Sequence, residues 1–295
     1  MTRVQVEHAV TTKDGRTLTA REAGDPGGVP VVVHHGTPAS SLLYEPHIRD
    51  AEEKGIRLIS YDRPGYGGST RLEGRSVGDC AADVTALCDA LEIDRFCTWG
   101  ISGGGPHALA TAALLPNRVA AVAALASVAP SDAPGLDFLA GMGEQNRVEF
   151  SAVMEGGEAH AANHERDVQE MLAATPQSIV DALLTLLGPS DLEVLTGDYA
   201  EFFVAATRAG IGAQDGGWFD DDIVFVTPWG FALSSIGAPA LCLQGEQDQF
   251  VPYGHGVWLS QHIPGVEPWL TAEDGHLTLF VRRVPEVHAW LLERW

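Results

Sequence analysis

The chain has 295 residues, of which 45% are hydrophobic and 20% are charged, so it is long enough to bury a sizeable core. Its 18 Lys and Arg residues against 40 Asp and Glu residues give a formal net charge of −22. This charge argues against nucleic acids and anionic membranes as partners, because binding either one needs clustered basic side chains.

The N-terminal segment and the cysteines predict a cytoplasmic protein. The first ten residues, MTRVQVEHAV, lack the apolar stretch of a signal peptide, and the longest apolar run, 119–129, is too short to span a bilayer. No C-x-x-C spacing occurs among the four cysteines, Cys80, Cys88, Cys97 and Cys242. We therefore expect buried free thiols in a reducing compartment, in preference to disulfides or a zinc site.

Strand-like and helix-like segments alternate in the first 130 residues. The ranges 4–10 and 17–23 predict an antiparallel pair around the turn KDGR. Apolar runs then predict the strands of a parallel sheet over 29–36, 56–62, 95–100 and 119–127. Helices are predicted after Ser76, which caps an apolar stripe, and from Gly103. This alternation indicates a doubly wound, mostly parallel α/β sheet.

The alternation stops near residue 131 and resumes with a strand-like run at 238–245. Between these points the chain has helical stretches separated by Gly and Pro, and this length exceeds an ordinary loop. We therefore predict an α/β core formed by 1–130 and 236–295, with an inserted helical cap over 131–235.

One short motif, Gly100-Ile101-Ser102-Gly103-Gly104, lies where a predicted strand ends and a predicted helix begins. A nucleophile elbow needs this context, because the sharp turn exposes the serine hydroxyl near the positive end of the helix. A nucleophilic serine also needs two N–H donors for the developing oxyanion. We predict these donors to be the backbone N–H groups of Gly103 and of Thr37 in the loop HHGTPAS.

The chain resembles the α/β-hydrolase fold superfamily, and in particular its small esterase-like enzymes with a helical cap. The motifs that carry the resemblance cover both ends of the chain and leave the insertion unmatched: HGTP (35–38), DRPGYGGS (62–69), GISGG (100–104), LCLQGEQDQFVP (241–252) and EDGHLTL (273–279). The elbow holds Ser102, whereas haloalkane dehalogenases and epoxide hydrolases of this superfamily have Asp there.

The resemblance implies a catalytic triad in the order Ser, Asp, His. Asp248 follows the strand-like run 241–245 and is the expected acid, with Glu246 and Asp132 as weaker alternatives. His276, in the sequence DGH, is the expected general base. Three other histidines in this region are expected to have packing or surface roles: His255, His262 and His288.

The expected activity is hydrolysis of a small to medium, mostly apolar ester through an acyl-enzyme, with a small molecule as the partner and no metal or organic cofactor. Alternatives are a lactonase, an amidase or aminopeptidase-like hydrolase, another triad enzyme of the same fold, or a non-catalytic binding protein. The oligomeric state stays open. Large apolar side chains are expected on the inner face of the cap: Phe138, Met142, Phe150, Met154, Phe202, Phe203, Trp218 and Trp229.

Other polar groups are expected to be structural. His34 and His35 belong to the predicted oxyanion loop. His160 and His164 have the spacing of a metal pair but no third ligand, so an exposed helix face is expected. The acidic run FDDDI (219–223) lacks the alternating oxygens of a calcium loop, and helix capping is expected for it.

Overall fold

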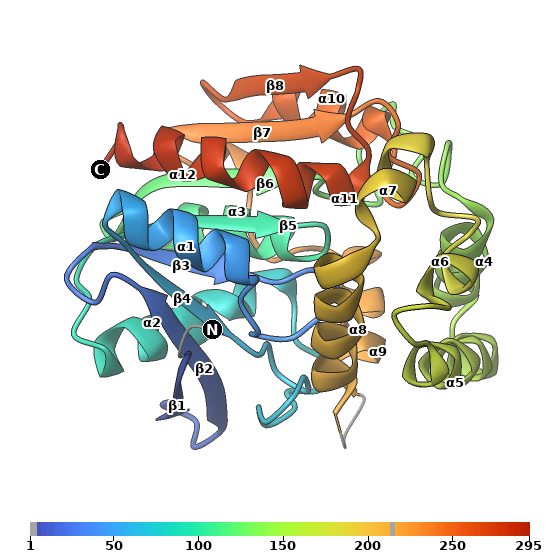
Figure 1. Cartoon of the computed structure of the whole chain (residues 1–295), viewed down its shortest axis with the longest axis horizontal. Coiled ribbons are helices and arrows are strands. Elements are labelled where there is room, and N and C mark those ends of the chain that lie inside the picture. Colours follow the sequence, from blue (N-terminus) through green and yellow to red (C-terminus); the bar gives the residue numbers. More distant parts are fainter. Residues whose placement is uncertain (1–4, 213–215) are drawn as a thin grey trace.

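A twisted eight-stranded sheet forms the centre of the molecule in the computed structural model, which describes residues 5–212 and 216–295 (Figure 1). The strand order is β1-β2-β4-β3-β5-β6-β7-β8; β1 and β2 are antiparallel to their neighbours, and the strands from β4 to β8 are parallel. The strands are β1 (Val6–Thr11), β2 (Thr17–Gly24), β3 (Val29–His34), β4 (Ile56–Tyr61), β5 (Phe96–Ile101), β6 (Val119–Leu125), β7 (Ala240–Gly245) and β8 (Glu267–Thr271). The predicted mostly parallel α/β sheet is confirmed.

Helices cover both faces of the sheet, which explains why its central strands are apolar throughout. One face packs on α1 (Glu45–Lys54) and α12 (Val284–Leu292), which lie in front of the sheet in Figure 1. The other face packs on α2 (Cys80–Ala90), α3 (Gly104–Leu114) and α10 (Tyr253–His262). Every residue of β5, β6 and β7 is buried.

The segment between β6 and β7 is helical, as the absence of strand patterns predicts. It contains α4 (Glu144–Glu155), α5 (Gly157–Ala173), α6 (Ile179–Ala182), α7 (Pro189–Val194), α8 (Gly197–Ile211) and α9 (Gly216–Phe225). We call these six the inserted helices; they lie together beside the edge of the sheet where the parallel strands end (Figure 1). Whether residues 131–235 form a separate cap domain stays a prediction.

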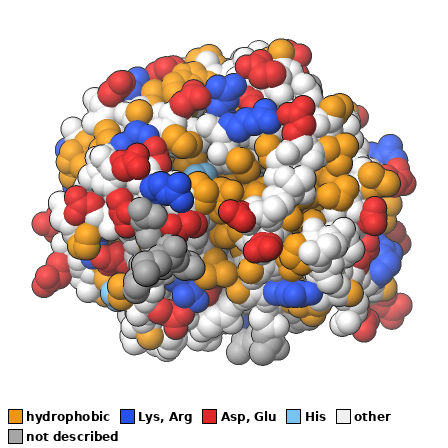
Figure 2. All heavy atoms as spheres, viewed as in Figure 1, with side chains coloured by type: hydrophobic (Ala, Val, Ile, Leu, Met, Phe, Trp, Pro, Cys, Tyr) orange, Lys and Arg blue, Asp and Glu red, His pale blue; other side chains and the backbone are white. Residues whose placement is uncertain are grey.

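The surface and the thiols agree with the composition. Acidic side chains are scattered over the face shown in Figure 2, with fewer basic ones between them. All four cysteines are buried with free thiols. Within residues 5–212 and 216–295, no helix is long and apolar enough to cross a membrane.

Candidate functional site

Ser102 occupies the sharp turn between β5 and α3. Its φ of 54° lies in the left-handed region, which is unfavourable for a residue with a side chain. The turn is held by a 2.9 Å hydrogen bond from the Ser102 N–H to the Leu125 carbonyl oxygen. Glycine is required on both sides, because an added Cβ would lie 2.2 Å from a backbone oxygen at Gly100 and 2.1 Å from one at Gly104. The sequence motif therefore corresponds to a strained strand-to-helix turn.

His276 begins α11 (His276–Thr278), and its imidazole faces Asp248 in the loop after β7. The His276 Nδ1 atom lies 2.8 Å from Asp248 Oδ2, and both residues are buried. The other carboxylate oxygen accepts hydrogen bonds from the N–H groups of Phe250 (2.9 Å) and Val251 (2.8 Å). With its oxygens held in this way, Asp248 can fix the orientation of the imidazole ring.

A second carboxylate, which the sequence analysis missed, holds the backbone at His276. Asp191 on α7 is fully buried and accepts three backbone N–H hydrogen bonds, from His276 (3.0 Å), Leu277 (2.8 Å) and Thr278 (3.0 Å). These N–H groups form the start of α11, so Asp191 acts as its cap from a distant part of the chain.

The two carboxylates also change the acidity of the imidazole. Burial by itself lowers the pKa of His276, but the negative charge of Asp248, with a smaller contribution from Asp191, raises it above the ordinary value. The imidazolium form of His276 is therefore stabilised, as proton uptake from a serine hydroxyl requires.

The predicted oxyanion loop lies against the elbow. A Cβ added to Gly36 would be 3.4 Å from the Ser102 Cβ, and one added to Gly103 would be 2.3 Å from Thr37 Oγ1. Thr37, Ser102 and Gly103 are therefore neighbours in space. This arrangement brings the two residues expected to supply the N–H donors together beside the serine.

Two pockets of about 120 Å³ each share Ser102 as a lining residue, and we call them the first and second lobes of the cavity. His276 lines the first lobe, together with a mainly apolar wall formed by Tyr44, Trp99, Ile101, Tyr199, Phe202 and Phe280. The second lobe is lined by apolar side chains and by four carboxyl groups of the inserted helices: Glu149, Asp167, Glu170 and Asp222. Small molecules that reach Ser102 therefore meet one mainly apolar surface and one that also carries carboxyl groups.

Only part of the predicted apolar lining faces this cavity. Its walls include Phe150, Phe202, Phe203 and Trp218. By contrast, Phe138, Met142 and Trp229 lie in a hydrophobic core cluster, and Met154 is 48% exposed. Helical spacing alone does not distinguish a buried side chain in a small core from one that lines a cavity.

The alternative acids and bases have other surroundings. Glu246 and Asp132 are exposed. The two ring nitrogens of His255 are bonded to the N–H of Ala129 (3.0 Å) and the carbonyl of Phe138 (2.9 Å). His288 Nδ1 lies 2.7 Å from Asp50 Oδ2.

Burial lowers the pKa of His34 to about 3, which keeps that ring neutral. His262 stacks on Trp258 near the surface.

The expectation of an exposed face for His160 and His164 is wrong. Both rings are buried between α5 and α9, where His160 Nε2 lies 3.2 Å from Asp222 Oδ2 and stacks on Phe219. The sequence of α5 is mostly polar and gives no sign that these two histidines are buried, because the residues that cover them belong to another helix, α9. Among the described residues, no group of three or more His, Cys, Asp or Glu side chains could hold a metal ion.

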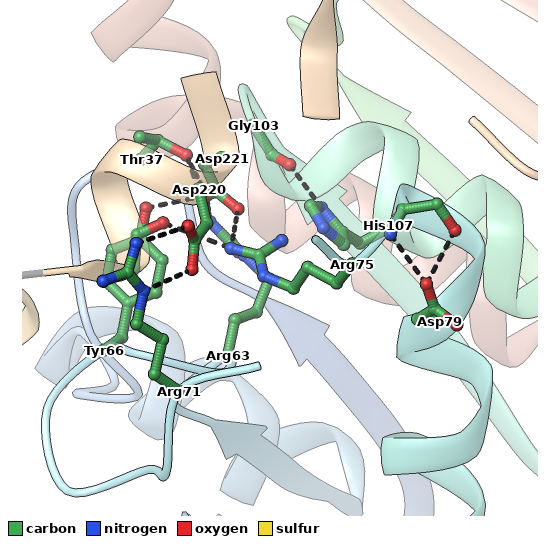
Figure 3. A network of polar contacts seen from close by, with 12 residues as sticks. Thr37, Arg63, Tyr66, Arg71, Arg75, Asp79, Gly103, His107, Asp220 and Asp221 are labelled. Carbon is green, nitrogen blue, oxygen red and sulfur yellow. Dashed lines mark hydrogen bonds and ion pairs between the residues drawn. The ribbon is translucent and has the colours of Figure 1, made fainter. Parts of the chain in front are cut away.

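The expectation of helix capping for FDDDI is also wrong. Asp220, Asp221 and Asp222 are buried within α9, and the first two form ion pairs with arginines of the strand core (Figure 3). Asp220 binds Arg71 through two hydrogen bonds of 2.9 and 2.8 Å. Three acids inside an otherwise apolar helix were the available sequence signal, because buried carboxylates need charged partners.

Comparisons with known proteins agree with this architecture. The family model described as alpha/beta hydrolase fold matches residues 29–282. A non-heme chloroperoxidase of Streptomyces lividans is 29% identical over 260 residues, covering 83% of each chain. A bifunctional esterase/perhydrolase of Acinetobacter calcoaceticus is 29% identical over 259 residues, again covering 83% of each chain. The solved structure of an alpha/beta hydrolase fold protein from Nakamurella multipartita superposes with a TM-score of 0.70 and 26% identity, over 97% of this chain and 99% of that chain.

Proposed function

Since the chain belongs to the alpha/beta hydrolase fold family, we propose that it is a serine hydrolase that cleaves small to medium, mostly apolar esters. The observation that carries this proposal is the strained Ser102 in a cavity shared with His276, whose Nδ1 atom lies 2.8 Å from the Asp248 carboxylate. A strained backbone at a hydroxyl-bearing residue that lines a cavity is a feature of functional sites.

In the proposed mechanism, Ser102 Oγ attacks the ester carbonyl carbon while His276 takes the hydroxyl proton. The N–H groups of Thr37 and Gly103 stabilise the oxyanion of the tetrahedral intermediate. The intermediate then collapses, the carbon–oxygen bond to the alcohol breaks, and His276 gives its proton to the leaving alcohol. Water, deprotonated by His276, attacks the acyl-enzyme and releases the carboxylic acid and the free serine.

The walls of the cavity support a preference for neutral substrates. The first lobe offers aromatic and aliphatic surface for an apolar group. The second lobe carries the carboxyl groups of Glu149, Asp167, Glu170 and Asp222, and the described residues that line it include no Lys, Arg or His side chain to pair with an anionic substrate group. We therefore expect neutral esters to react faster than esters with a second carboxylate or a phosphate.

The first test is hydrolysis of para-nitrophenyl esters of graded acyl length by the native protein and by Ser102→Ala. Loss of a triad serine lowers kcat by about 10⁶-fold, so the variant should fall close to the uncatalysed rate. Ser260→Ala on α10 is the control and should keep the native rate, because its hydroxyl bonds the Val257 carbonyl oxygen within the same helix and Ser260 does not line the cavity. Equal rates for Ser102→Ala and the native protein would exclude the proposed mechanism.

Peroxyacid formation is a second candidate activity, because one relative that covers 83% of this chain is an esterase/perhydrolase. The same acyl-enzyme would then react with hydrogen peroxide in place of water and release a peroxyacid. Adding peroxide to the ester assay and measuring peroxyacid tests this directly.

The cellular setting is proposed on separate grounds. Four buried free thiols support a reducing, cytoplasmic compartment. The net charge of −22 supports a small-molecule substrate over nucleic acid or an anionic membrane.

A further inference from the structure

Asp221 on α9 contacts the loop that carries Thr37, although the two residues are far apart in the sequence (Figure 3). Its Oδ2 atom accepts hydrogen bonds from the Thr37 hydroxyl (2.6 Å), the Tyr66 hydroxyl (2.7 Å) and Arg63 (2.5 Å). Its Oδ1 atom accepts one from Arg75 (2.7 Å). This one carboxylate therefore joins an inserted helix to the strand core at four points.

The Thr37 hydroxyl is held between a donor and an acceptor. It accepts a 3.1 Å hydrogen bond from Arg63 and donates its own proton to Asp221. Arg63 also donates to the carbonyl oxygen of His35, so the guanidinium holds the loop on both sides of Gly36. Charge-assisted hydrogen bonds of this kind are stronger and more strongly directed than neutral ones.

The Thr37 hydroxyl also lies against Gly103, the residue after the serine. A Cβ at Gly103 would be 2.3 Å from Thr37 Oγ1 and 2.7 Å from the ring of Phe225, which belongs to α9 as well. The Thr37 side chain therefore packs directly against the backbone of Gly103 and separates the two residues.

We propose that Asp221 is a positioning residue for the oxyanion site: through the Thr37 hydroxyl it sets the Thr37 N–H relative to the Gly103 N–H. This inference rests on the proposed function, in which these two groups bind the oxyanion. The carboxylate is suited to the role because it stays charged: burial raises its pKa, but Arg63 and Arg75 outweigh burial and hold the pKa well below its usual range. Oxyanion donors act only over a narrow range of distance, so a small displacement weakens them.

The test compares three variants with a matched control. Thr37→Val removes the hydroxyl with little change of shape, Thr37→Ser keeps it, and Asp221→Asn removes the charge. The control is Asp220→Asn, which breaks the ion pair between α9 and Arg71 without contacting the oxyanion loop. Thermal unfolding identifies variants that do not fold; if Asp221→Asn fails to fold, the two Thr37 variants decide alone.

We expect Thr37→Val and Asp221→Asn each to lower kcat for a para-nitrophenyl ester by about 10- to 100-fold, with KM changed less than twofold. Thr37→Ser should recover most of the kcat that Thr37→Val loses, and Asp220→Asn should stay within threefold of the native kcat. Combining Thr37→Val with Asp221→Asn should cost no more than the more damaging of the two single variants, because one change removes and the other weakens the same hydrogen bond. A native kcat in Thr37→Val, multiplying effects in the double variant, or an equal loss in Asp220→Asn would overturn the inference.

Amide hydrogen exchange of residues 35–40 gives a readout that does not depend on activity. We expect faster exchange in Thr37→Val and Asp221→Asn than in Asp220→Asn, and unchanged exchange in both would overturn the inference. An inactive native protein, or a fully active Ser102→Ala, would overturn the proposed function alone, since the exchange measurement still decides whether Asp221 orders this loop.

Discussion

Ser102 keeps its left-handed backbone because glycine lies on each side of the turn, and His276 keeps its place because Asp191 accepts the N–H groups that follow it. In both cases a neighbouring residue, and not the candidate catalytic side chain itself, fixes the geometry. The clearest consequence concerns Asp191, whose negative charge also favours the protonated form of His276.

Asp191→Asn should change both the rate and its pH dependence. Loss of one acceptor loosens the start of α11, and we expect kcat/KM at its optimum to fall about 10-fold. In the proposed mechanism the reaction requires neutral His276, so activity should be lost as pH falls through the pKa of this residue. Because the carboxylate raises that pKa, its removal should shift the acid limb of the kcat/KM profile to lower pH.

Glu193→Gln provides the control on the same helix, since Glu193 forms only a surface ion pair with Arg282. Its profile should match that of the native protein. A slower Asp191→Asn variant with an unshifted acid limb would show that Asp191 acts on the backbone alone.

Residues of this kind are the ones that the sequence analysis could not find. Ser102 lies in a short motif between a predicted strand and a predicted helix, and Asp248 and His276 lie in motifs that carry the resemblance to the α/β-hydrolase superfamily, so these three could be proposed. Asp191 and Asp221 have partners 85 and 184 residues away, in segments with no shared periodicity. Such pairs become visible only when the topology is known.

At the scale of elements, α9 contacts both the other inserted helices and the residues that surround the central sheet. Successive helical residues point about 100° apart, so its three consecutive aspartates face different partners. Asp220 pairs with Arg71, Asp221 holds the oxyanion loop, and Asp222 lies beside His160 of α5. Glu149 of α4 completes this contact by accepting a 2.9 Å hydrogen bond from Trp218 of α9.

Glu149→Gln should make the stability of the protein less dependent on pH. Burial, followed by the neighbouring Asp222, raises the pKa of Glu149 well above its ordinary value. The folded state therefore favours the neutral acid, and this contribution, complete below the unfolded pKa, is lost as pH rises through the folded one. Gln stays neutral and can still accept from Trp218, so Tm should fall less between about pH 5 and pH 9 in the variant than in the native protein.

The matched control is Glu155→Gln at the exposed end of the same helix, which should follow the native protein at every pH. If Glu149→Gln loses as much Tm as the native protein over this range, the raised pKa does not contribute to folding.

The sequence analysis did not predict β8 or α1, and the physical reason differs between the two. β8 has five residues, includes a proline and lies at the edge of the sheet, where only partial burial leaves a weak apolar pattern. α1 is mostly polar and buries only His47, Ile48 and Ala51. By contrast, the fully buried strands β5, β6 and β7 were predicted because burial on both faces demands continuous apolar residues.

At the scale of the whole molecule, the excess of acidic residues places like charges over the surface (Figure 2). Their mutual repulsion opposes the compact state and is screened by salt. We expect Tm to rise by about 2–4 °C when NaCl is raised from about 20 to 200 mM, as measured by calorimetry at pH 7. A fall in Tm over this range would mean that attractive ion pairs outweigh the repulsion.

Two aspartates of the inserted helices form hydrogen bonds to loops that follow strands of the central sheet: Asp191 binds at His276, and Asp221 binds at Thr37. Recombination that exchanges the inserted helices for those of a relative, in evolution or in the laboratory, would thus replace the wall of the cavity and these two aspartates in one step. If both aspartates position the site as proposed, we expect a transplanted segment to give an active enzyme with a new substrate range only when it also places a carboxylate at both positions. Libraries of chimeras should therefore keep these two aspartates constant while the remaining inserted positions vary.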